Sequence, residues 1–346
     1  MSPPTAEAVV FRLRSPLLLS ALALGSLLAS GCVSAARVRE DLDSGRTQGV
    51  YLDRLPFEPQ RKGLCGPAAL SSLLDHWGRP ATQEEIGKEA YDPAIGGSSG
   101  FALWRYARRA GLAALQVRPC DAGRLDALLG QGIPVILNLD LVDPGARTCL
   151  CFGPRFAEIR NIQHYVLVVG HDRTNGLWVI QDGRRPDRVV TEAWLAPRWE
   201  TRGRWALLAF PPEMSVTGLS YDDHVLGAER VEELGHPEAA VRHLREAVRL
   251  EPERPGALNN LAAHLAREPA GLAEAEGLAR RAVTASENDP VRRPYAMDTL
   301  GVILGKQGHP GEARRLFEEA LKLLPPGSDL AKEIQGHYNE QPHPRN

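Results

Sequence analysis

Cys65 stands at the start of an apolar stretch, 67–77, that predicts a helix. A thiolate is the nucleophilic form of cysteine, and the N–H groups and dipole at a helix start favour negative charge. Pro67 suits an early helical position because no N–H is needed there, and Gly66 would let a substrate approach closely. We therefore take Cys65 as the candidate nucleophile, with a buried structural cysteine as the alternative.

His164 is the candidate base, because it opens the strand predicted over 164–170 and its backbone is therefore firmly held. A partner imidazolium would lower the pKa of the Cys65 thiol further. Asp182 ends the strand predicted over 176–181. If these strands pair antiparallel, the end of one lies beside the start of the other, so Asp182 could orient the imidazole.

Gln60 lies five residues before Cys65. Its side-chain N–H could stabilise an oxyanion together with the backbone N–H of Cys65, and an exposed loop residue is the alternative. Other residues are weaker candidates for the same roles: His76 and His171 for the base, Asn138 and Asp140 for the orienting group.

The chain has 346 residues, 43% of them hydrophobic and 24% charged, so it is globular and long enough for two domains. Its net charge is −2 with no basic block, so nucleic acid is not an expected partner. Helices followed by antiparallel strands indicate an α+β domain. We predict helices over 67–77, 83–90, 100–110 and 121–130, and strands over 112–118, 133–139, 164–170, 176–181, 187–191 and 204–210.

Residues 221–327 contain an internal repeat and no strand pattern. Gly235, Ala240 and a proline at 252 recur with the same spacing at Gly308, Ala313 and a proline at 325. The middle copy, around 275, is irregular. These copies resemble tetratricopeptide repeats, which pair helices into a curved array and bind peptides or proteins; an unrelated helical bundle is the alternative.

Residues 1–32 combine early arginines, a short apolar run and small residues before Cys32. This pattern reads as a signal peptide, and its end resembles the lipobox of bacterial lipoproteins. The resemblance implies lipidation of Cys32 and an outer-membrane lipoprotein facing the periplasm. In that compartment Cys120 could form a disulfide with Cys149 or Cys151, or all three could remain reduced.

The pattern around Gln60, Cys65, His164 and Asp182 resembles the papain-like double-glycine (bacteriocin-leader) peptidases and their stand-alone relatives. The resemblance implies a papain-like cysteine peptidase domain, with a Cys65–His164–Asp182 triad and Gln60 as oxyanion donor. The sequence departs from the pattern in two places: the Gln60-to-Cys65 gap is one residue shorter than in many papain-like enzymes, and an insert at 143–160 precedes His164. The expected organisation is a signal peptide (1–32), tether (33–50), peptidase domain (51–210), linker (211–220), repeats (221–327) and tail (328–346).

Hydrolysis of peptide bonds in a peptide or protein substrate is the function that these residues favour, with the repeats as a possible site for a protein partner. Transglutaminase-like acyl transfer and an inactive scaffold that binds through its repeats are the alternatives. The sequence contains no glycine-rich phosphate loop and no paired metal motif, so we expect neither cofactor nor metal.

Overall fold

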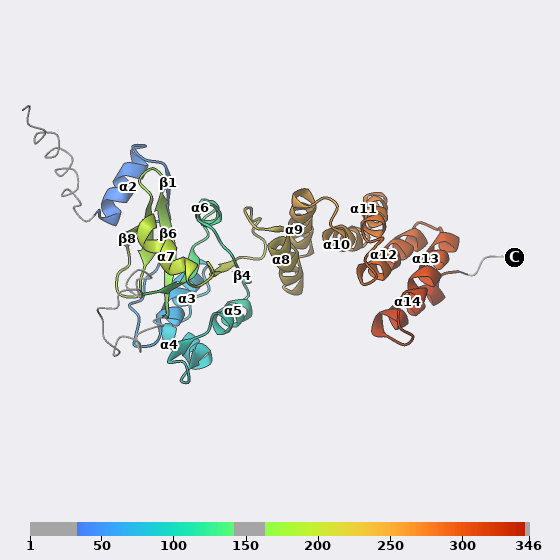
Figure 1. Cartoon of the computed structure of the whole chain (residues 1–346), viewed down its shortest axis with the longest axis horizontal. Coiled ribbons are helices and arrows are strands. Elements are labelled where there is room, and N and C mark those ends of the chain that lie inside the picture. The colour runs from blue at the N-terminus through green and yellow to red at the C-terminus, as the bar shows by residue number, and fades with distance from the viewer. Residues whose placement is uncertain (1–32, 142–162, 343–346) are drawn as a thin grey trace, which may run out of the picture.

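The structure is a computed structural model that describes residues 33–141 and 163–342. An α+β domain is followed by a row of helices that extends away from it in one direction (Figure 1). This confirms the predicted fold class. Within the described ranges, no helix is both long and apolar enough to cross a membrane.

Seven strands form one antiparallel sheet in the order β4-β9-β5-β6-β7-β8, with β1 beside β6. The longest strand, β6 (Gln163–Asp172), pairs with β5 (Val135–Asp140) along its first half and with β1 (Gly49–Tyr51) along its second. On its other edge it pairs with β7 (Leu177–Gln181), as predicted. The other strands are β4 (Ala113–Val117), β8 (Arg188–Thr191), β9 (Ala206–Phe210) and a small ribbon of β2 (Tyr91–Asp92) and β3 (Gly97–Ser98).

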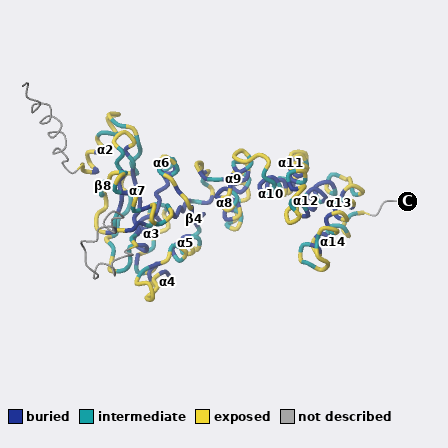
Figure 2. The backbone as a smooth tube through the Cα atoms, in the orientation of Figure 1, coloured by how far each residue is buried: buried dark blue, intermediate teal, exposed yellow. Residues whose placement is uncertain are grey.

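Both faces of the sheet are buried (Figure 2). Successive residues of β6 alternate between two cores: Val166 and Val168 belong to one, Leu167 and Val169 to the other. The Leu167 face packs on α3 (Cys65–His76), α4 (Gln83–Ala90) and α5 (Gly100–Arg109). The Val166 face packs on α6 (Ala122–Leu129) and α7 (Glu192–Glu200). His164 lies near the start of β6, and because this strand is buried on both faces, the backbone at His164 is firmly held.

Side-chain caps begin most helices of this domain. Thr82 and Glu85 form the predicted capping box of α4, while Ser99, Asp121 and Thr191 cap α5, α6 and α7. Helix α7 was not predicted, because Pro197 lies inside it and interrupts the helical pattern.

The predicted tether is wrong for most of its length. Residues 35–43 form helix α2 (Ala35–Asp43), capped by Ser34, and residues 49–51 form β1. Ala35 and Val38 are buried in the core that contains α3. Leu42 packs against the same core, but most of the other side chains of α2 are polar, and this polar composition concealed the helix in the sequence.

Three helix pairs follow, and they support the repeat pattern. The residues at the repeated alanine position, Ala240, Ala275 and Ala313, are all fully buried. Gly235 and Gly308 adopt φ of +84° and +85° at the turn inside their pairs, a conformation that favours glycine. The pairs are α8 (Tyr221–Glu233) with α9 (Pro237–Leu250), α10 (Pro255–Leu265) with α11 (Leu272–Ala285), and α12 (Arg292–Lys306) with α13 (Pro310–Lys322); a 3-10 turn, η3 (Pro269–Gly271), interrupts the middle pair.

The predicted tail is also wrong over 329–340, which forms helix α14 (Asp329–Glu340) with Ser328 as its cap. Ile334 is fully buried in the core of the repeats, and His337 lies 6.1 Å from Phe317 between ring centroids. A terminal helix of this kind covers the apolar side of the last pair, which would otherwise face solvent.

Candidate active site

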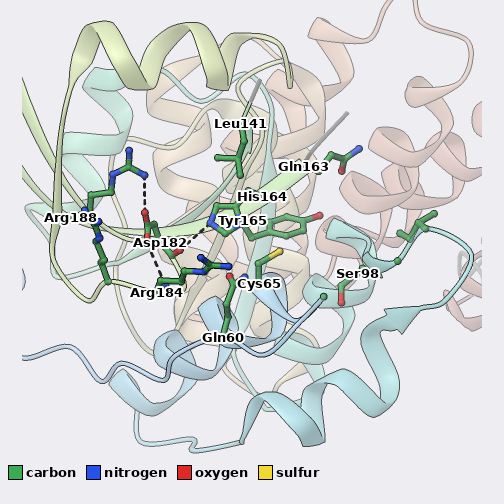
Figure 3. Close-up of a pocket in the computed structure, with 15 residues that line it drawn as sticks. Gln60, Cys65, Ser98, Leu141, Gln163, His164, Tyr165, Asp182, Arg184 and Arg188 are labelled. Carbon is green, nitrogen blue, oxygen red and sulfur yellow. Dashed lines mark hydrogen bonds and ion pairs between the residues drawn. The ribbon is translucent and has the colours of Figure 1, made fainter. Parts of the chain in front are cut away.

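All four predicted site residues line one cavity of about 810 Å³ (Figure 3). Cys65 comes from the start of α3, His164 from the start of β6 and Asp182 from the residue after β7. Gln60 precedes α3. The cavity is also lined by Gly63, Ile95, Gly96, Gly97, Ser98, Leu141, Gln163, Tyr165, Arg184, Arg185 and Arg188.

Helix α3 differs from α4 to α7 in lacking a side-chain cap: its N-cap residue is Leu64, which makes no such hydrogen bond. Backbone N–H groups at the helix start therefore remain available to the sulfur of Cys65. The N–H groups of Tyr165, Gly66 and Cys65 lower the thiol pKa, but burial outweighs them and raises it overall. Burial thus opposes the thiolate that the sequence predicted.

Gly66 does not leave room for a substrate, contrary to our expectation. It is buried, and a Cβ placed on it would lie 2.9 Å from Leu103 and 3.1 Å from the ring of Tyr165. Gly66 therefore allows α3 to pack closely against α5 and β6.

His164 is fixed by the backbone of Asp182. Its Nε2 donates to the carbonyl oxygen of Asp182 at 3.1 Å, which leaves Nδ1 without a proton and able to accept one. Burial lowers the imidazole pKa, partly offset by Asp182. Across the described ranges, no hydrogen bond joins Cys65 to His164, and in substrate-free sites such contacts are often long.

The Asp182 carboxylate has a different partner from the one predicted. Its Oδ2 pairs with Arg188 at 2.8 Å, and its Oδ1 accepts weakly from the N–H of Arg184 at 3.4 Å. The Arg188 guanidinium also lies over the ring of Trp194, 4.5 Å from its centroid. The carboxylate thus braces the 182–188 loop, whereas the carbonyl holds the imidazole.

Gln60, in the segment before α3, and Ser98, in β3, offer polar atoms to the cavity. The N–H of Gln60 donates to the carbonyl of Gly183 at 2.7 Å, and a Cβ at Gly183 would collide with the Gln60 side chain. The Oε1 of Gln60 and the Oγ of Ser98 are buried and have no partner among the described residues. Buried polar atoms of this kind are suited to bonding a bound substrate.

Sequence reasoning did not identify Ser98, Arg184 or Arg185 as site residues. Ser98 lies in β3, and the two arginines follow the Asp182-Gly183 turn. The glycines before Ser98 signal a turn, but only the fold brings that turn to Cys65.

The weaker candidates do not line the cavity. His76 bonds the carbonyl of Gly132 at 3.0 Å, and His171 pairs with Asp126 at 2.7 Å while stacking on Trp178. The two candidate orienting residues also have other neighbours: Asn138 donates to Gln163 at 3.3 Å, and Asp140 lies 3.6 Å from Arg202.

Cys120 is a buried free thiol, and burial raises its pKa to about 12. The disulfide predicted for Cys120 would involve Cys149 or Cys151, so its pairing stays a prediction. Cys32, Cys149 and Cys151 lie outside the described residues.

One described group combines metal-ligand residue types, and it lies in the repeats, away from the cavity. It consists of Asp298, Glu333 and His337. The Nδ1 of His337 donates to Asp298 at 2.8 Å, which gives this contact an ordinary hydrogen-bond explanation.

Comparison with known proteins identifies both regions. Residues 52–207 match the Peptidase_C39 like family, and residues 294–326 match the tetratricopeptide repeat. The chain therefore contains a C39-like peptidase domain followed by a helical tetratricopeptide-repeat region.

Solved structures resemble each region separately. A C39-like peptidase from Bacillus anthracis shares 15% identity, covers 47% of this chain and 98% of its own, and has a TM-score of 0.36. YrrB, a TPR protein with an unusual peptide-binding site, shares 19% identity over 34% of this chain and 58% of its own, with a TM-score of 0.29. Pseudomonas aeruginosa pilF shares 21% identity over 36% of this chain and 63% of its own, with the same score of 0.29. No curated protein matches.

Proposed function

We propose that this protein is a cysteine peptidase that hydrolyses peptide bonds at the cavity formed by Cys65 and His164. One observation carries the proposal. The Nε2 of His164 is occupied by the Asp182 carbonyl, so its Nδ1 is the free acceptor in a cavity that also holds the Cys65 thiol.

The reaction then follows from these positions. Nδ1 of His164 accepts the Sγ proton as the sulfur bonds to the substrate carbonyl carbon, whose oxygen becomes an oxyanion. The N–H of Cys65 and the side-chain N–H of Gln60 stabilise that charge. The tetrahedral adduct collapses to a thioester as the imidazolium protonates the leaving amine. Water, deprotonated by His164, cleaves the thioester and regenerates the thiol.

Digestion of a mixed peptide library tests this function, with cleavage products identified by mass spectrometry. We expect cleavage by the wild-type protein and a loss of at least about a thousandfold in Cys65→Ser. Cys120→Ser, which removes a buried thiol outside the cavity, should retain activity. Absence of cleavage by the wild-type protein would favour the scaffold alternative, and cleavage that persists in Cys65→Ser would exclude Cys65 as the nucleophile.

We further propose that the repeats bind a protein or peptide, as is typical of tetratricopeptide arrays. The match to this repeat at residues 294–326 supports the proposal. Partner proteins that co-purify with the full chain can be crosslinked to it and the crosslinks located by mass spectrometry. Crosslinks concentrated in residues 221–327 would support the proposal, and crosslinks confined to residues 33–220 would contradict it.

Attachment to the outer membrane through a lipid on Cys32 also remains a proposal, supported by the Ala29-Ser30-Gly31-Cys32 sequence. Expression in a bacterium with labelled fatty acid should label the wild-type protein and not Cys32→Ser. Equal labelling of both proteins would contradict the proposal.

A further inference from the structure

One wall of the cavity is rich in arginine. The 182–188 loop, which joins β7 to β8, contributes Arg184, Arg185 and Arg188 to the lining. Figure 3 shows the Arg184 side chain extending from beside Asp182 toward Gln60 and Cys65. The loop thus carries positive charge to the place where a substrate would react.

Two of these arginines are not neutralised. Arg188 pairs with Asp182, the one acidic residue among the described lining residues. Arg184 and Arg185 are exposed and form no ion pair with any residue in the described ranges. Among the described lining residues, guanidinium groups therefore exceed carboxylates by two, in a protein whose net charge is −2.

The loop that carries them is fixed by two backbone hydrogen bonds and one side-chain hydrogen bond. The N–H of Gln60 donates to the carbonyl of Gly183 at 2.7 Å, and the N–H of Asp182 donates to that of Arg185 at 3.2 Å. The hydroxyl of Tyr51 donates to Asp187 at 2.7 Å. A loop fixed before binding loses little conformational entropy when a ligand arrives.

The chemistry of these groups indicates the ligand. A guanidinium presents a planar fork of donors that matches a carboxylate, and such pairs are stronger than neutral hydrogen bonds. Arg184 is also close enough to His164 for its charge to lower the imidazole pKa. An anion bound at Arg184 would lie in the cavity that also holds Cys65 and His164.

We propose that Arg184 and Arg185 form an anion-binding subsite, which selects substrates with a carboxylate close to the scissile bond. This inference rests on the proposed peptidase function for its substrate, but the subsite itself can be tested without catalysis. The carboxylate comes from an Asp or Glu side chain or from the terminus of a short peptide, and the experiment separates these two sources.

Alkylation of Cys65 by two reagents of different charge tests the subsite. The rate with iodoacetate, an anion, is divided by the rate with neutral iodoacetamide, so that differences in thiol reactivity cancel. We expect Arg184→Gln/Arg185→Gln to lower this ratio about tenfold, and 0.5 M salt to lower it in the wild-type protein. Arg280→Gln/Arg315→Gln, which removes the same charge from exposed sites on the repeats, should leave the ratio unchanged. An equal ratio in wild type and the 184/185 variant would overturn the proposal.

Paired peptides then identify the source of the carboxylate. For each cleaved peptide, one series replaces Asp or Glu beside the scissile bond with Asn or Gln, and another replaces the free C-terminus with an amide. A fall in kcat/KM of about tenfold in one series, absent in the 184/185 variant, identifies the source. Cleavage that is indifferent to both replacements contradicts the subsite but not the peptidase. A charge-dependent alkylation ratio with no cleavage of any peptide contradicts the peptidase but not the subsite.

Discussion

His164 receives its orientation from a main-chain atom. The bond from Nε2 to the Asp182 carbonyl fixes the tautomer, a role that the sequence suggested for the Asp182 carboxylate. Every residue type has a backbone carbonyl, so this hydrogen bond does not require an aspartate at position 182. It requires only that the backbone at position 182 lies beside β6. The carboxylate instead pairs with Arg188.

Substitution of Asp182 should therefore cost less activity than substitution of His164. We expect Asp182→Asn to lower kcat/KM by no more than about tenfold, and His164→Ala by about a thousandfold or more. Kinetics with a cleaved peptide would measure both, with Asp187→Asn as a control in the same loop. If Asp182→Asn were as inactive as His164→Ala, the carboxylate would be the orienting group after all.

The protonation of Cys65 and His164 gives a second expectation at this scale. Burial raises the pKa of the thiol and lowers that of the imidazole, so the neutral pair is favoured in the free protein. The iodoacetamide rate at Cys65 should therefore climb about tenfold per pH unit from pH 7 to above pH 9. Mass spectrometry of the labelled peptide measures this profile. A plateau below neutral pH would instead indicate the thiolate–imidazolium pair that the sequence suggested.

The same raised thiol pKa also affects stability. The Cys65 thiol keeps its proton to higher pH in the folded protein than in the unfolded chain. Its contribution to the free energy of unfolding is therefore complete below the pKa of the unfolded thiol. This contribution is lost as the pH rises through the higher pKa of the folded protein.

The residues that we propose to perform chemistry were more predictable than the residues that surround them. Cys65 and His164 could be recognised because each lies at the start of a helix or strand, and the sequence pattern predicts where these elements start. Arg184 and Ser98 could not, because a loop arginine and a ribbon serine have no special local pattern. Their place in the cavity depends on how the chain folds back.

Elements differed in predictability for the same reason. Helix α4 carries its own boundary signal in the capping box at Thr82, and the structure matches the predicted bounds 83–90. Helices α2 and α14 are amphipathic but strongly polar, and their buried side chains are few. What stabilises them is packing against other elements, which a local pattern does not reveal.

Close packing between α12 and α13 depends on a glycine. A Cβ at Gly301 would lie 2.5 Å from the ring of Phe317, which is fully buried. We expect Gly301→Ala to lower the free energy of unfolding by about 1–3 kcal/mol, because the ring has no space to move. Urea denaturation measures this change.

Gly277 in α11 is the matched control. It is exposed and has no atom within 4 Å of an added Cβ, so Gly277→Ala should raise the free energy of unfolding by about 0.5–1 kcal/mol. Stabilisation by Gly301→Ala as well would show that the α12–α13 contact is looser than described.

At the scale of the whole molecule, the repeats are joined to the α+β domain by a shared core. One buried cluster continues from the sheet through Val216 and Leu219 into the helix pairs. Arg230 of α8 donates to the carbonyl of Leu112 at 3.5 Å, and Arg124 pairs with Asp223 at 3.1 Å. The predicted linker 211–220 thus lacks regular structure but packs between the two regions.

A pair of histidines lies where the repeats meet the α+β domain, and we expect its protonation to lower the stability of the protein in acid. The Nδ1 atoms of His224 and His243 lie 3.0 Å apart, and the ring centroid of His243 lies 6.2 Å from that of Phe210 in β9. Only one of these nitrogens can donate while the other accepts, so full protonation breaks the contact. Burial lowers the pKa of His243 to about 4.

The stability that His243 contributes is therefore complete above its unfolded pKa and is lost as the pH falls from about 6.5 to about 4. This loss amounts to at most about 3 kcal/mol. His243→Gln should shrink the difference in unfolding free energy between pH 7 and pH 4.5, measured in urea. His309→Gln, at an exposed site, should not. An unchanged difference in His243→Gln would show that other groups cause the acid sensitivity.

The proposed hydrolysis depends on a covalent acyl group on Cys65, and hydroxylamine partitioning measures that group most directly. A peptide cleaved by the wild-type protein is digested at rising hydroxylamine concentrations, and the acid and hydroxamate products are quantified by mass spectrometry. Because hydroxylamine competes with water for a thioester, we predict a hydroxamate fraction that rises with concentration and disappears with Cys65→Ser. Cleavage that yields only the acid at every hydroxylamine concentration would contradict the thioester and with it the proposed function.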